Sequence, residues 1–109
     1  MANTFDRKTQ RSIGTSATAI ESYSPASGIA TVIGLSLSNR ISSQVLVDVV
    51  FNDGTNSTYM IKSAPIPVGG SLVVVGGDQK VVMKPTDTIE VTSDTAASVD
   101  AVMSVLEIT

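Results

Sequence analysis

From residue 29 onward, apolar and polar residues alternate along short segments with a period near two. Residues 33–38 alternate Ile or Leu with Gly or Ser, and the odd positions of residues 45–51 are three valines and a phenylalanine. Successive side chains of a strand point to opposite faces, so both segments are predicted as strands with one buried face. The helical spacing of three and four residues is never sustained for three turns, which indicates an all-β protein.

Turn residues separate these segments. Asn52-Asp53-Gly54 is a strong hairpin signal, because Asn, Asp and Gly tolerate positive φ. Further turns are predicted at the glycine pairs 69–70 and 76–77 and at Pro85, and a loop is favoured over a helical turn at 94–98. The pattern therefore predicts a β-sandwich, jelly-roll or Ig-like, of about eight short antiparallel strands. The extended segments lie at 12–23, 29–38, 45–52, 59–66, 71–75, 80–83, 89–92 and 98–108.

Two predicted strands are apolar on both faces, whereas a two-layer sandwich buries only one face of each strand. Residues 72–75 have no polar position, and the last strand carries apolar residues on both its odd and its even positions. These strands can curl around a barrel-like core, their second apolar row can meet another subunit, or the row can simply be exposed. The candidate interface residues from these strands are Leu72, Val73, Val74, Val75, Val102, Leu106 and Ile108.

The length of 109 residues suits one domain. Only 16% of the residues are charged, against roughly 25% in a typical soluble protein, so the surface is poorly protected against association and a homo-oligomer is expected. The basic cluster Arg7, Lys8 and Arg11 predicts either a solvated leader or a basic arm that docks on an acidic neighbour. We therefore divide the chain into an N-terminal arm over 1–11, dispensable for folding, and a β-sandwich domain over 12–109.

The missing residue types narrow the function further. The chain has no cysteine, no histidine and no tryptophan, which removes the usual thiol nucleophile, the usual proton carrier at neutral pH and the commonest ligands of transition metals. The acids Asp53, Asp78, Asp87 and Glu90 are interpreted as solvated turn residues. We expect no enzyme activity, catalytic residue, cofactor or metal site. The net charge of −3 and the absence of a long apolar stretch predict no nucleic-acid or membrane partner.

Part of the sequence resembles small structural proteins of tailed bacteriophages, including cyanophages. The resemblance rests on TYMIKSAPIPVGGSLVVVGGDQK at 58–80, PTDTIEVTS at 85–93 and SVLEI at 104–108, and is least clear over the first 28 residues. It implies a β-sandwich virion protein, made in the host cytoplasm, that contacts the major capsid protein or neck and tail proteins. The run does not specify the position in the particle.

Among the functions that the resemblance implies, we favour a capsid decoration or cement protein. A neck, tail or baseplate adaptor, or a fibre-attachment protein, is the alternative. A host-surface carbohydrate-binding module is a further alternative, but the four aromatic residues give no stacking platform for sugars. A small hydrolase is the least favoured interpretation.

Overall fold

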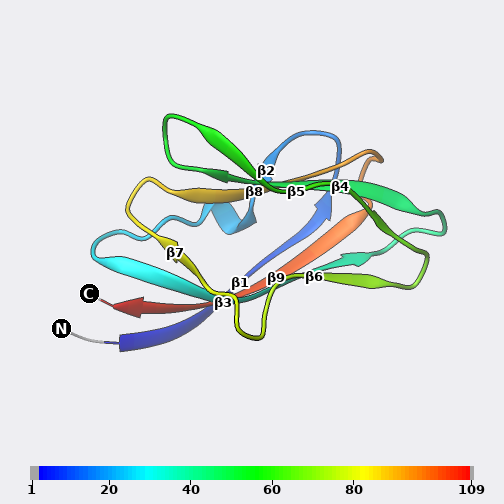
Figure 1. Cartoon of the computed structure of the whole chain (residues 1–109). Coiled ribbons are helices and arrows are strands. Elements are labelled where there is room, and N and C mark those ends of the chain that lie inside the picture. Colours follow the sequence, from blue (N-terminus) through cyan, green and yellow to red (C-terminus); the bar gives the residue numbers. More distant parts are fainter. Residues whose placement is uncertain (1–2, 109) are drawn as a thin grey trace.

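The computed structural model describes residues 3–108, which form two antiparallel β-sheets packed face to face (Figure 1). Sheet A contains, in spatial order, β1 (Asn3–Ile13), β9 (Val99–Ile108), β3 (Ile29–Asn39) and β6 (Ser71–Val75), and β7 (Val81–Met83) pairs with β3 beside β6. Sheet B contains β2 (Thr18–Ala19), β8 (Thr88–Ser93), β4 (Val45–Asn52) and β5 (Ser57–Ile66). One short 3₁₀ turn, η1 (Ile20–Ser22), follows β2.

The strands pair in nested order along the chain. Strand β1 pairs with β9, β2 with β8, β3 with both β6 and β7, and β4 with β5. A long hairpin rolled up in this way into two sheets is a jelly roll. The predicted all-β sandwich is therefore confirmed. The described residues contain nine strands, rather than about eight, because β1 and β2 form where a single extended segment at 12–23 was predicted.

The core lies between the two sheets and is built by alternate residues of the strands. On β9 the buried residues Ala101, Met103 and Val105 occupy every second position, as the period of a strand requires. Strands β3, β4 and β8 contribute in the same way. The hydrophobic residues packed there provide most of the driving force for folding.

The predicted turns form where the sequence indicated them. After β4, Gly54 adopts φ +91°, and its N–H donates to Asn52 Oδ1 over 2.8 Å. Before β6, the N–H of Gly70 donates to the carbonyl oxygen of Pro67 over 2.9 Å. Both turns contain Gly together with Asn, Asp or Pro, residue types that favour the backbone angles of tight turns.

The structure differs from the prediction at the N-terminus. Residues 3–11, expected as an arm, belong to β1, which pairs with β9 from Asn3 opposite Ile108 to Ile13 opposite Val99. Residues 1–2 of the predicted arm lie outside the described residues. The strand was not recognised because its side chains are mostly polar and exposed, whereas backbone pairing needs no apolar pattern. Removing residues 1–11 would therefore uncover an edge of β9 instead of trimming a free arm.

A β-bulge explains why residues 72–75 are apolar throughout. Val73 is opposite Ser36 and Val75 is opposite Leu35, so Val74 is an extra residue on β6. Leu72 and Val74 pack against the core, and Val75 is fully buried. Only Val73 points away from the core, so this strand has no second apolar row that requires a cover.

Candidate interaction surface

The register of sheet A aligns apolar side chains on the face that points away from sheet B, which we call the outer face of sheet A. One row across the strands contains Phe5 on β1, Leu106 on β9, Thr31 on β3 and Val82 on β7. Their neighbours in sequence on β9 and β3 are buried between the sheets, so these residues lie on the opposite face. Three of the four side chains in this row are apolar.

A second row lies further along the strands and contains Thr9, Val102, Ser36 and Val73. At the open end of the sheet, Ile108 is opposite Ile29. Between these rows, Ile33 occupies a bulge in β3 and lines a shallow depression with Phe5 and Ser104. The apolar residues of the outer face are Phe5, Ile29, Ile33, Val73, Val82, Val102, Leu106 and Ile108.

Several of these side chains are largely exposed to solvent. The exposed fractions are 74% for Phe5, 66% for Val73, 51% for Val82 and 50% for Val102. Single exposed apolar residues are common on soluble proteins, but here they recur on neighbouring strands of one sheet face. Exposed apolar residues gathered on one face in this way indicate an interaction site.

The outer face of sheet B has a different character. Asp48 is opposite Thr92 and Val50 is opposite Glu90, so the central rows carry carboxylates and hydroxyls. Tyr59 is exposed on β5, and the Lys62 ammonium lies 4.7 Å from the centre of its ring. The polar side chains make this face a weaker candidate for apolar contact.

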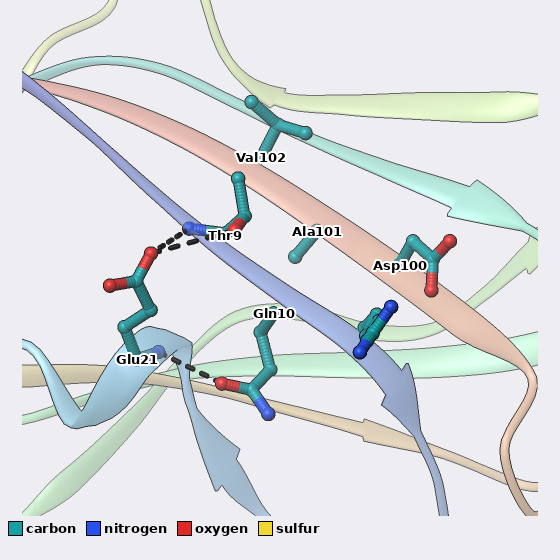
Figure 2. A pocket seen from close by; sticks show the side chains of 7 residues that line it. Thr9, Gln10, Glu21, Asp100, Ala101 and Val102 are labelled. Carbon is teal, nitrogen blue, oxygen red and sulfur yellow. Dashed lines mark hydrogen bonds between the residues drawn. The ribbon is translucent and has the colours of Figure 1, made fainter.

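The β1 edge of sheet A is partly blocked by side chains of the chain itself. Glu21 Oε2 accepts a hydrogen bond from the N–H of Thr9 over 2.6 Å, and Gln10 Oε1 accepts one from the N–H of Glu21 over 3.0 Å (Figure 2). Asp6 Oδ1 accepts a hydrogen bond from the N–H of Arg7 over 2.8 Å. The N–H groups of Arg7 and Thr9 are therefore not available to a strand added beside β1, so the face of the sheet is a better docking surface than this edge.

The free edge of sheet B, strand β5, is irregular as well. Ser63 adopts φ +53° within an interruption of the register between Val47 and Val49 of β4. Pro65 has no N–H to offer a further strand. Bulges and prolines at an edge disfavour strand addition.

The three basic residues predicted as one cluster lie on β1, where Arg7 and Lys8 point to opposite sides of the strand. Arg7 is opposite Ser104 of the outer face, and Arg11, four residues on, is exposed. Lys8 lies on the other side of the strand, where its Nζ is 3.1 Å from Asp6 Oδ2 and 4.9 Å from the centre of the Tyr23 ring. Lys8 is therefore partly engaged within the domain.

The side chains around Lys8 form a small polar network at the open end of the sandwich. The Tyr23 hydroxyl donates to Glu107 Oε2 over 2.7 Å. Burial, with this hydrogen bond and the charge of Glu107, raises the pKa of Tyr23. The backbone N–H of Arg7, followed by Lys8, lowers the pKa of Asp6. Tyr23 therefore stays neutral and holds η1 against β9.

The remaining candidate interface residues fall into three groups. Val75 is 1% exposed and cannot meet a partner, which corrects that part of the prediction. Leu72 and Val74 are half-buried against the core. Val73, Val102, Leu106 and Ile108 lie on the outer face of sheet A. The sequence prediction missed Phe5, Ile29, Ile33 and Val82, although Phe5 is an isolated aromatic residue in a polar segment, a signal that could have marked it.

Two acidic residues of the turns, Asp53 and Asp87, bind backbone N–H groups. Asp53 Oδ1 accepts from the N–H of Asn56 over 2.7 Å and from that of Thr55 over 2.9 Å, and these bonds lower the pKa of Asp53. Asp87 Oδ2 accepts from the N–H of Lys84 over 2.8 Å. Within residues 3–108 there is no group of three or more His, Cys, Asp or Glu residues that could hold a metal ion. The same residues include no helix long and apolar enough to span a membrane.

Comparison with known proteins supports the fold. No family model and no curated protein matches this chain. A solved structure from Bacillus endospore appendages, described as disulfide-linked pili, aligns with a TM-score of 0.53 and 17% sequence identity. The alignment covers 96% of this chain and 87% of that one. At this identity the likeness concerns the β-sandwich fold alone.

Proposed function

We propose that this protein is a structural subunit that adheres to a neighbouring protein in a larger assembly. The observation that carries the proposal is the outer face of sheet A, on which the apolar residues Phe5, Val73, Val82 and Val102 are exposed. Burying such a face is favourable in proportion to the apolar area removed from water. The chain has no cysteine, so its contacts cannot include disulfide links such as those of the Bacillus pili that share the fold.

The assembly that we propose is the virion of a tailed bacteriophage, with the chain as a capsid decoration or cement protein. Two observations support this choice: the resemblance of residues 58–80 and 85–93 to small virion proteins, and a compact β-sandwich with one adhesive face. Many copies on a symmetric shell would convert modest individual contacts into durable attachment. A neck, tail or baseplate adaptor would adhere through the same apolar face and would differ in its copy number per particle.

Mass spectrometry of purified particles, with copy number per particle, tests the proposal. A decoration protein is expected in many copies that electron microscopy places across the shell, whereas an adaptor is expected at one vertex. The substitution Val102→Asp should reduce the copy number, and Lys62→Asp on sheet B should leave it unchanged. Particles that lack the chain altogether, or that retain Val102→Asp fully, would contradict the proposal.

A further inference from the structure

The register of sheet A places Arg7 and the turn 76–80 on opposite edges of the outer face, at the same position along the strands. Arg7 on β1 is opposite Ser104, which is opposite Gly34 of β3. On the other side of β3, Val75 pairs with Leu35 and Val81 pairs with Val32, so the turn 76–80 leaves the sheet level with residues 33 and 34. Arg7 and this turn therefore lie at the two ends of one cross-strand line.

The turn 76–80 also projects from sheet A on the side away from sheet B (Figure 1). It carries the exposed carboxylate of Asp78, while the Lys80 ammonium donates to the carbonyl oxygen of Gly77 in the same turn. The outer face thus has a basic residue at one edge and a raised turn with a free carboxylate at the other.

A two-fold axis in the plane of this face and parallel to the strands would make such an arrangement self-complementary. Rotation about it places each edge over the opposite edge of the other copy and preserves the level along the strands. Arg7 of each copy then meets the turn with Asp78 of the other. An axis across the strands would instead bring β1 onto β1, with Arg7 near its own counterpart, which like charges disfavour. Face-to-face sheets commonly pack with their strands about 30° from parallel, which this axis permits.

The size of the face suits a pair of copies. Four strand positions about 4.8 Å apart, each about ten residues long at roughly 3.3 Å per residue, give a footprint of roughly 600 Å². A stable interface buries about 800 Å² of accessible surface on each partner. Since side chains corrugate the face, its accessible area exceeds the flat footprint, so the face is comparable in size to one side of such an interface.

We propose that two copies of this chain pair through the outer faces of sheet A, about a two-fold axis along the strands, with Arg7 of each copy against Asp78 of the other. This inference rests on the proposed function, since it names the partner that the adhesive face takes. Val102 on β9 lies in the middle of the contact, Val73 on β6 lies toward its edge, and the two charge pairs flank it and fix the register.

Sedimentation equilibrium of the purified full chain over a dilution series tests the pairing. The native chain is expected as a dimer, and Val102→Asp as a folded monomer with an unchanged circular dichroism spectrum. Arg7→Asp and Asp78→Arg should each raise the dissociation constant roughly ten-fold, because each change places like charges at both ends of the contact. The double variant, with the charges exchanged, should return to within about three-fold of the native value. Lys62→Asp is the matched control and should have no effect.

A native chain that stays monomeric at high concentration would overturn the dimer, and a double variant no better than either single one would overturn the contact between Arg7 and Asp78. The pairing of two copies and the proposed virion role can fail independently of each other. A monomer that still attaches to particles through Val102 would refute the pairing alone. A dimer with the expected charge rescue that is missing from purified particles would support the pairing and refute the virion role.

Discussion

Asn39 connects the two sheets at the end of β3, and its removal should be among the most destabilising single changes. Its side chain is buried, and Nδ2 donates to the carbonyl oxygens of Ser43, Ile66 and Pro67 over 2.8, 3.0 and 3.3 Å. Its Oδ1 accepts from the N–H of Ile41 over 2.9 Å. One side chain thus binds the loop after β3 and the end of β5 in the other sheet.

The cost of Asn39→Ala follows from these bonds. Leaving the buried carbonyl of Ile66 without a donor costs about 1–3 kcal/mol, and the partly buried partners add about 0.5–1.5 kcal/mol each where water does not replace the bond. We expect a loss of about 3 kcal/mol in the free energy of unfolding. With a urea m-value of about 1.5 kcal/mol/M for a domain of this size, the unfolding midpoint should fall by about 2 M.

Urea unfolding followed by far-ultraviolet circular dichroism measures this shift. Asn39→Asp should be at least as damaging, because it replaces the donor with a second acceptor that faces carbonyl oxygens. Asn56→Ala is the matched control: its side chain is exposed, and the change should stay within about 0.5 kcal/mol. An Asn39→Ala variant as stable as this control would refute the idea that the Asn39 bonds hold the sheets together.

Three further predictions follow from the described geometry. Val73→Asp should fold normally and associate less, whereas Val75→Asp should fail to fold. Circular dichroism with sedimentation separates the two variants, and equal behaviour would contradict the assignment of faces. Gly70→Ala should lower the free energy of unfolding by about 1–3 kcal/mol, because its Cβ would lie 2.9 Å from Pro67 Cγ and 3.1 Å from Pro67 O; an unchanged urea midpoint would be inconsistent with this clash. The pKa of Asp53 should be below its ordinary value of 3.8 by NMR titration, so its contribution to stability is present above pH 3.8 and lost as the pH falls through the lowered pKa; a normal pKa would argue against its turn bonds.

The fold was predictable where side chains report their own environment. Alternation in residues 33–38 and 45–51 locates β3 and β4, and Asn52-Asp53-Gly54 locates the turn between β4 and β5. The β1 strand was missed because an edge strand held by backbone bonds needs no apolar face. The bulge at Val74 was missed because it depends on the pairing with β3, which the local sequence does not encode.

The candidate surface was predictable only in part, for a related reason. Val102 and Leu106 were found because they alternate with core residues of β9. Phe5 was missed because it joins the surface only through the pairing of β1 with β9, between residues far apart in the sequence. Val75 was included because its burial results from the same bulge that interrupts the alternation of β6.

Hydroxyl-radical footprinting read by mass spectrometry tests most directly whether the outer face of sheet A is the adhesive surface. The comparison is between the free chain, at a dilution where it is monomeric, and the associated or particle-bound chain. We expect oxidation of Phe5 on sheet A to fall several-fold on association, while Tyr59, exposed on sheet B, reacts equally in both states. Protection of Tyr59 with unchanged oxidation of Phe5 would contradict the account.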